Sequence, residues 1–184
     1  MSILSCSESA GTMGVIAAER AIAASGLDKS EIGMIIVATA TPDKAFPSTA
    51  VLIQDKLGLH GCAAFDISAA CGGFIYAMTI ADQFIRTGHT KHVLIVGAEA
   101  LSRICDWTDR TTCILFADGA GAFVLGPSEE PGLVTSHIHA DGSYSNLLYC
   151  DNAITPKPNS GKQNIVMAGN DVFKVAVNTL SRVA

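Results

Sequence analysis

The residues best suited to chemistry in this sequence surround one cysteine, Cys71. Residues 65–74 form the string FDISAACGGF, which predicts a strand, a tight turn of small residues, and Cys71 in the first turn of a helix. At a helix N-terminus, free backbone N–H groups and the helix dipole stabilise a thiolate. Such a thiolate can attack a carbonyl carbon, and the Cys71 N–H can help to hold the oxyanion that forms. The pattern predicts an acyl-accepting nucleophile.

A second interpretation of Cys71 is structural. A buried cysteine usually serves as a small apolar residue, and spacing alone leaves the two interpretations near even. The small residues on either side leave room for a substrate carbonyl beside the sulfur; they are Ala69, Ala70, Gly72 and Gly73.

The remaining cysteines and histidines predict no metal site. The six cysteines stand at 6, 62, 71, 105, 113 and 150, without a CxxC pair or zinc-like spacing, and we expect reduced thiols. We interpret Cys62, Cys105, Cys113 and Cys150 as packing or loop thiols. His137 and His139 alternate on an expected strand but lack a third ligand, so we expect them at a hydrogen-bonded strand edge.

The segment 118–122 (DGAGA) has the glycines of a phosphate-binding loop, but it lacks both GxGxxG and a P-loop lysine. We expect a turn between strands there.

Alternating helices and strands must position Cys71. Hydrophobic periodicity predicts helices over 12–24, 48–57, 71–87 and 171–184, with Gly26, Gly58 and Gly88 as helix stops. Apolar runs predict strands over 33–40, 62–66, 92–98 and 133–140, and one or two strands within 112–125. This alternation favours an α/β layered fold with a largely parallel sheet. The helix over 71–87 is apolar on nearly all sides, which predicts an interior position.

Composition excludes several classes of protein. The 184 residues are 49% hydrophobic and only 16% charged, which excludes disorder and predicts that some apolar surface meets another subunit or segment. A net charge of −5 argues against nucleic-acid binding. We find no uncharged apolar run of the ~18 residues that a membrane span needs. We also find no secretory signal pattern, so we expect a cytoplasmic protein.

Five segments, in this order, resemble the β-ketoacyl-acyl carrier protein synthase III family of thiolase-like condensing enzymes. They are DISAACGGFIYAM, VLIVGAE, RICDWTDRTTCILFADGAGAFVL, HIHADGSYSNLL and MAGNDVFKVAV. The resemblance implies a layered α-β-α-β-α fold assembled as a homodimer. It also implies that Cys71 takes an acetyl group from acetyl-CoA as a thioester. Malonyl-acyl carrier protein then loses CO2 and attacks the thioester, which gives acetoacetyl-acyl carrier protein and starts fatty acid synthesis. No separate cofactor is implied.

In this family a histidine and an asparagine assist the cysteine, in His-Gln-Ala-Asn and Asn-Thr-Ser-Ala motifs; neither motif occurs in this sequence. The resemblance therefore covers a partial chain. The helix over 171–184 reaches the last residue without a cap, which also indicates a cut. We expect a first thiolase-like half over 1–140, an exposed connection over 141–164, and the start of a second half over 165–184.

Four more residues gain an expected role from the resemblance. Arg110, in WTDR, matches an arginine that lies against the adenine of CoA, although alone it would be a solvated loop charge. Phe46, in AFPS, matches a phenylalanine that reaches across the dimer to the partner's acyl pocket, although it could be core packing. Leu148 and Phe173 lie in segments that line the acyl or pantetheine tunnel, although such residues are usually plain core.

Two rival functions remain open at this stage. The chain could belong to another condensing enzyme of the superfamily, with a branched or longer acyl-CoA primer or a quinolone or polyketide product. Alternatively, it could be a non-catalytic fragment or assembly module that keeps the dimer surface without the histidine and asparagine.

Overall fold

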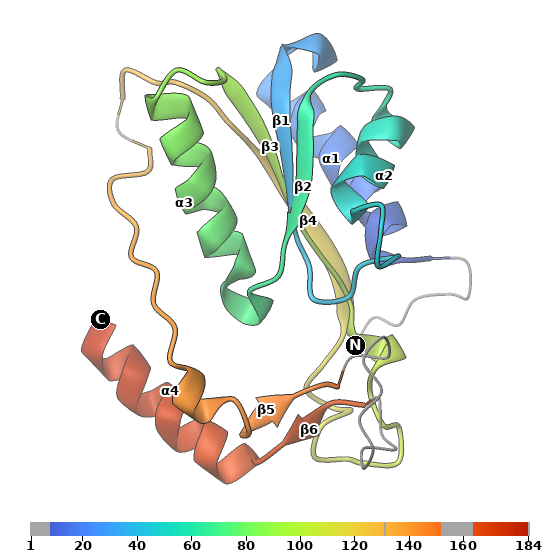
Figure 1. The fold of residues 1–184 in the computed structure, drawn as a ribbon, viewed down its shortest axis with the longest axis vertical. Helices are drawn as coiled ribbons and strands as arrows, with labels where there is room; N and C mark the ends of the chain where they lie inside the picture. The colour runs from blue at the N-terminus through green and yellow to red at the C-terminus, as the bar shows by residue number, and fades with distance from the viewer. Residues whose placement is uncertain (1–7, 131, 152–163, 184) are drawn as a thin grey trace. The chain divides into compact units, whose positions relative to one another are not determined.

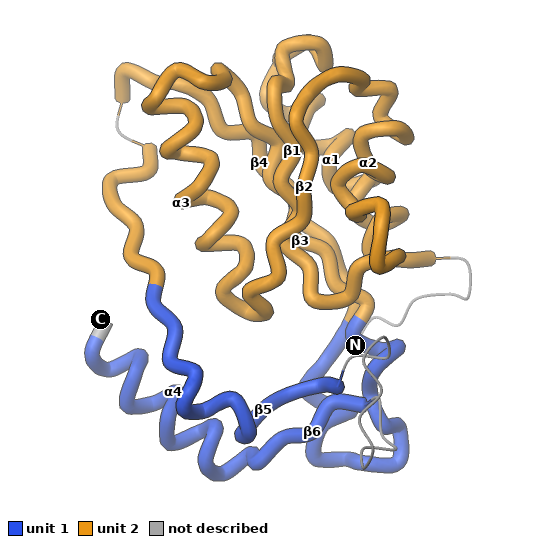
Figure 2. The backbone as a smooth tube through the Cα atoms, in the orientation of Figure 1, with its two compact units in different colours: residues 1, 101–117, 139–184 blue, residues 2–100, 118–138 orange. Residues whose placement is uncertain are grey.

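The computed structural model describes residues 8–130, 132–151 and 164–183 of the chain (Figure 1). These residues divide into two compact units (Figure 2). The larger unit comprises residues 2–100 and 118–138, and the smaller one comprises residues 101–117 and 139–184. Each unit is described by itself below.

The larger unit contains a four-stranded sheet in the order β2-β1-β3-β4. Its strands are β1 (Ile32–Ala38), β2 (Ala63–Ile67), β3 (His92–Ala100) and β4 (Asp118–Leu125). The first three strands run parallel and β4 pairs antiparallel with β3. The sheet is therefore largely parallel, as the sequence predicts, and the carboxyl ends of β1, β2 and β3 meet at one edge.

Helices cover both faces of this sheet (Figure 1). On one face, α1 (Ala10–Ser25) and α2 (Thr49–Leu57) pack on a cluster that includes Ile35, Val37, Leu94 and Val96. On the other face, α3 (Gly73–Arg86) packs on a cluster that includes Met34, Ile36, Val93 and Ile95. Because successive side chains of a strand point to opposite faces, the continuous apolar runs of β1 and β3 supply both clusters. The unit thus has three α-β-α layers.

One extra residue interrupts the pairing of β1 with β3. Ile32 pairs with His92 and Met34 pairs with Val93, so Gly33 has no partner of its own in this register. A Cβ atom at Gly33 would collide with the side chain of Thr90. The bulge places Ile32 in the α1 and α2 cluster although Met34, two residues later, lies on the α3 side.

The ends of α1 and α2 follow from local chemistry. The hydroxyl of Ser9 accepts a hydrogen bond from the Thr12 N–H, and that of Ser48 accepts one from the Val51 N–H. Gly26 and Gly58 end these helices in the left-handed conformation, with φ of 71° and 69°. The predictions of Ser48 as a cap and of Gly26 and Gly58 as stops are confirmed.

Three predictions about local structure are wrong. Residues 118–121 do not form a turn, because they pair with β3 as the start of β4, which is the one strand within 112–125. The described residues within 133–140 form no strand, so the edge position expected for His137 and His139 is not observed. Helix α3 buries one face only, through Gly73, Ala77 and Ala81, and exposes Ile75.

The smaller unit contains a short antiparallel pair and one long helix. Its elements are β5 (Leu148–Tyr149), β6 (Val166–Met167), α4 (Gly169–Val183) and the 3-10 turns Leu101–Arg103 and Gly142–Tyr144. The connection expected over 141–164 carries β5, and its residues 152–163 lie outside the described part. None of the helices in the described ranges has both the length and the apolar character that a membrane crossing requires.

Candidate functional site

Cys71 lies at the carboxyl edge of the sheet, between β2 and α3. It belongs to the 3-10 turn Ala70–Gly72, which leads directly into α3 at Gly73, so the cysteine precedes the helix by two residues. The Cys71 side chain is exposed. No side chain of the described residues caps this end of α3. The 3-10 turn pairs its N–H groups instead, since the Gly72 N–H donates to the Ala69 carbonyl and the Gly73 N–H donates to the Ala70 carbonyl.

The turn before Cys71 has a strained backbone. Ala70 adopts a φ of 43°, the left-handed region, and no other non-glycine residue of the described chain has a positive φ. This conformation costs an L-residue about 1–2 kcal/mol. Such strain persists only where surrounding contacts fix the backbone, so the packing beneath the turn must hold Cys71 in place.

Close packing fixes the start of α3 on the sheet. A Cβ atom at Gly73 would lie 3.2 Å from the Cβ of Ala38 in β1. A Cβ atom at Gly97 in β3 would lie 3.3 Å from the ring of Phe74. Ala38 is the last residue of β1 and the register partner of Gly97, so the first turn of α3 rests on two neighbouring positions of β1 and β3.

Phe46 lies in the loop that joins β1 to α2, and its side chain is 85% exposed. The loop is held on both sides of Phe46 by carboxylates. The Asp43 carboxylate accepts hydrogen bonds from the Ser9 hydroxyl and the Gly11 N–H. The Asp66 carboxylate accepts hydrogen bonds from the N–H groups of Thr49 and Ala50. This exposure fits a contact with another chain, and the dimer role stays a prediction.

Arg110 belongs to the smaller unit, in a series of turns between Leu101 and Ala117, and its side chain is exposed. The Asp109 carboxylate beside it accepts hydrogen bonds from the N–H and hydroxyl of Thr111. Trp107, three residues before Arg110, is 47% exposed. An exposed guanidinium in an ordered turn can meet a phosphate or stack on a ring; its role toward CoA stays a prediction.

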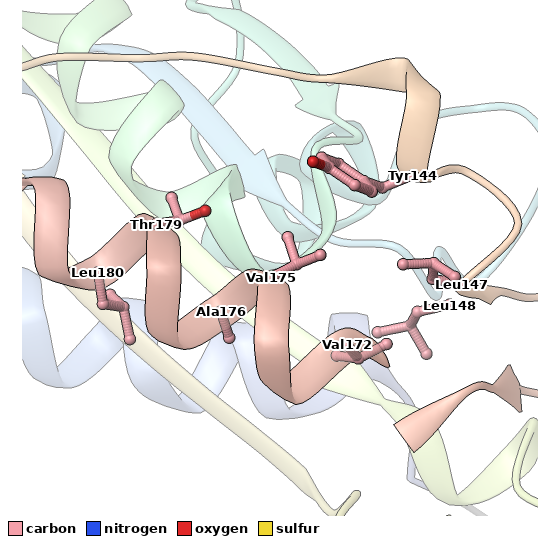
Figure 3. Close-up of a pocket in the computed structure, with 8 residues that line it drawn as sticks. All are labelled: Tyr144, Leu147, Leu148, Val172, Val175, Ala176, Thr179 and Leu180. Carbon is pink, nitrogen blue, oxygen red and sulfur yellow. The ribbon is translucent and has the colours of Figure 1, made fainter. Parts of the chain in front are cut away.

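Leu148 lines an apolar groove of about 420 Å³ in the smaller unit. Figure 3 shows the lining residues, which come from residues 144–148, up to the first residue of β5, and from one stripe of α4: Tyr144, Leu147, Leu148, Val172, Val175, Ala176, Thr179 and Leu180. Phe173 is 70% exposed and is not among them. The helical spacing of residues 172, 175, 176 and 179 is a visible signal for this stripe. The roles of Leu148 and Phe173 at an acyl or pantetheine tunnel stay predictions.

The other thiols differ in exposure. Cys105 and Cys113 are buried, Cys62 is half-buried and Cys150 is exposed. Burial, with the nearby Asp151 carboxylate as a second cause, raises the pKa of the Cys150 thiol. Within the described residues, no three His, Cys, Asp or Glu side chains gather as a metal site requires.

Comparisons with known proteins agree on one family. The family model of 3-oxoacyl-[acyl-carrier-protein (ACP)] synthase III matches residues 65–142, which include Cys71 and Arg110. The β-ketoacyl-[acyl-carrier-protein] synthase III of Thioalkalivibrio sulfidiphilus is 57% identical over 170 residues, which are 91% of this chain and 53% of that protein. The chain therefore spans about half the length of this relative.

Solved structures show the same relationship. The crystal structure of 3-oxoacyl-[acyl-carrier-protein] synthase III from Aquifex aeolicus VF5 is 46% identical, with a TM-score of 0.86, over 94% of this chain and 53% of that one. The priming β-ketosynthase of the R1128 polyketide pathway is 35% identical, with a TM-score of 0.87, over 97% of this chain and 54% of that one. By sequence and by its thiolase-like fold, this chain belongs to the 3-oxoacyl-[acyl-carrier-protein] synthase III family.

Proposed function

We propose that this chain supplies the acyl-accepting step of a β-ketoacyl-acyl carrier protein synthase III, with Cys71 as the nucleophile. The observation that carries the proposal is the exposed Cys71 at the start of α3, with no side chain of the described residues capping the helix. Its relatives carry the name of this synthase. The substrates would be acetyl-CoA and malonyl-acyl carrier protein, with no separate cofactor.

In the first step, the Cys71 thiolate attacks the carbonyl carbon of acetyl-CoA. The bond from that carbon to the CoA sulfur breaks, and CoA leaves as a thiolate that takes up a proton. The backbone N–H of Cys71 helps to stabilise the negative oxygen of the intermediate. The product of this step is an acetyl thioester on Cys71.

In the second step, malonyl-acyl carrier protein loses CO2, and its α-carbon attacks the acetyl carbonyl. The bond to the Cys71 sulfur breaks, and acetoacetyl-acyl carrier protein is released. The resemblance assigns the acid–base support of this step to a histidine and an asparagine in motifs that this sequence does not contain. The proposal for this chain therefore rests on the first step.

Labelled acetyl-CoA tests the first step directly. After incubation and peptide mapping, the label should be found on Cys71 and should be absent from the Cys71→Ala variant. Cys150→Ala is the matched control, because Cys150 is also exposed, and it should keep full labelling. Labelling of Cys150 in place of Cys71, or labelling that survives in Cys71→Ala, would refute the proposal.

A different primer is the second candidate. The 35% identical relative with a TM-score of 0.87 is named as a priming β-ketosynthase of a polyketide pathway, and this name supports priming of another pathway as the alternative. A panel of straight and branched acyl-CoA thioesters, each scored by acylation of Cys71, separates the two candidates. We expect acetyl-CoA to acylate Cys71 fastest.

The proposal also concerns the oligomeric state of the protein and its location in the cell. We infer a homodimer in which the exposed Phe46 contacts the partner subunit, and a cytoplasmic location. Turnover of acetyl-CoA and malonyl-acyl carrier protein by the chain alone would argue against a role as a non-catalytic assembly module. Turnover only after addition of a complementary polypeptide would favour that role.

A further inference from the structure

Glu99, at the end of β3, holds the segment that follows β1. Its Oε1 accepts a hydrogen bond from the Ala40 N–H at 2.8 Å, and its Oε2 accepts one from the Thr41 hydroxyl at 2.7 Å. The same Thr41 hydroxyl oxygen accepts a hydrogen bond from the Ala100 N–H at 2.8 Å. The carboxylate, the hydroxyl and the two backbone segments thus close a ring of hydrogen bonds between two neighbouring strands.

This ring lies next to the supports of the Cys71 turn. The residue before Ala40, Thr39, is buried, and its N–H donates to the Ile67 carbonyl at 3.1 Å, at the end of β2 and four residues before Cys71. Ala38 packs closely against the first turn of α3 at Gly73. Glu99 therefore fixes the backbone directly after Ala38, the last residue of β1, and Thr39, which follows it.

We propose that Glu99 is a positioning residue for Cys71, which acts through the end of β1; the proposal rests on the function proposed above. Charged hydrogen bonds between a carboxylate and backbone N–H groups are stronger than neutral ones. A strained turn needs such support, because Ala70 would otherwise relax from its φ of 43°. Loss of the Glu99 carboxylate should therefore let the turn relax and move the Cys71 sulfur away from the start of α3.

The test compares two carboxylates at opposite ends of β1. Glu99→Ala should slow the acetylation of Cys71 by acetyl-CoA on the order of tenfold. It should also lower the rate of Cys71 alkylation by iodoacetamide relative to that of Cys150 in the same molecule. Glu31→Ala is the matched control, because the Glu31 carboxylate accepts a hydrogen bond from the Asp28 N–H at 2.9 Å just before β1. This control should lower thermal stability without a change in either Cys71 rate.

Conservative variants separate positioning from a loss of folding. Glu99→Gln keeps one acceptor for the Ala40 N–H and should restore part of the acetylation rate. Thr41→Val removes the hydroxyl that joins Glu99 to Ala100 and should resemble Glu99→Ala. If Glu99→Ala does not fold, the Cys71 rates of Glu99→Gln and Thr41→Val are compared with those of wild type instead.

The outcomes distinguish the two proposals. Equal Cys71 rates in wild type, Glu99→Ala and Thr41→Val, at equal folded fractions, would overturn the positioning role. If wild type takes no acetyl group, the proposed function fails, and the ratio of Cys71 to Cys150 alkylation still decides whether Glu99 positions the thiol.

Discussion

The Asp66 carboxylate accepts a hydrogen bond of 2.7 Å from the backbone N–H of Thr49 and so links strand β2 to the first turn of helix α2. A second hydrogen bond of 2.7 Å, from the Ala50 N–H, uses the other oxygen of the same carboxylate. A single side chain thus pairs with two N–H groups that a helix start leaves without partners. Its negative charge also interacts favourably with the positive end of the helix dipole.

Removal of this carboxylate should destabilise the chain. Asp66→Ala should lower the free energy of unfolding by about 2 kcal/mol, because two partly buried N–H groups lose a charged acceptor. Asp66→Asn should cost less, because its amide oxygen still accepts one of the two hydrogen bonds. Urea denaturation measures both changes. The control is Asp82→Asn, which removes an exposed ion pair with Arg86 and should cost about 0.5 kcal/mol or less. An equal cost for Asp66→Ala and Asp82→Asn would contradict this account.

Substitutions at Ala70 should separate stability from reactivity. Glycine adopts a positive φ without strain, so Ala70→Gly should raise the free energy of unfolding by about 0.5 kcal/mol. It should also slow the acetylation of Cys71, because the turn is then free to relax. Ala70→Val should lower stability by about 1–2 kcal/mol, since a β-branched residue tolerates this conformation poorly. A slower acetylation in a more stable protein is the diagnostic result; a glycine variant that gains in both would show that the strain has no role.

Cys150 should react as a thiol with a raised pKa. Burial, and then the Asp151 carboxylate, raise the pKa of this thiol, so at a given pH the reactive thiolate is a smaller fraction than in a free cysteine peptide. The alkylation rate of Cys150 should therefore reach half its maximum at a higher pH than that of the peptide. Mass spectrometry after timed iodoacetamide treatment across a pH series measures this shift. Asp151→Asn should move the midpoint partly back, and a midpoint at or below that of the peptide would exclude the effect.

Phe46 should matter for association and not for the stability of one chain. Its side chain is 85% exposed, so Phe46→Ala should change the free energy of unfolding by less than about 0.5 kcal/mol. If the proposed dimer buries Phe46, the same change should weaken self-association, which sedimentation velocity measures over a concentration series. Val134→Ala, at another exposed apolar position of the same unit, should leave association unchanged. A self-association constant that is the same in wild type and Phe46→Ala would remove Phe46 from the interface.

The sequence allowed the ends of several elements to be predicted because local chemistry decides them. Helix α2 begins after the cap Ser48 and ends at Gly58, which adopts the left-handed conformation. Both residues indicated these ends in the sequence. The apolar runs of β1 and β3 predicted buried strands, since both of their faces are covered by helices.

Other features depend on contacts that no local pattern contains. The glycines of 118–121 favoured a turn, but antiparallel pairing with β3 overrides that preference. The alternation over 133–140 predicted a strand, but alternation alone forms no strand without a neighbour to pair with. Glu99 gave no signal of its own, because the partners of its carboxylate, Ala40 and Thr41, lie 59 and 58 residues earlier in the chain.

The bulge at Gly33 determines which side chain of β1 meets helix α3, which follows Cys71. With Ile32 held beneath α1 and α2, an uninterrupted alternation would turn Val37 toward α3 and Ala38 away from it. The branched side chain of valine would then press on the amino end of α3, where the Cβ of Ala38 already lies 3.2 Å from the site of a Gly73 Cβ. The single extra residue at Gly33, at the other end of β1, thereby decides which face of the sheet each later side chain of β1 points to. The packing that holds Cys71 depends on this choice.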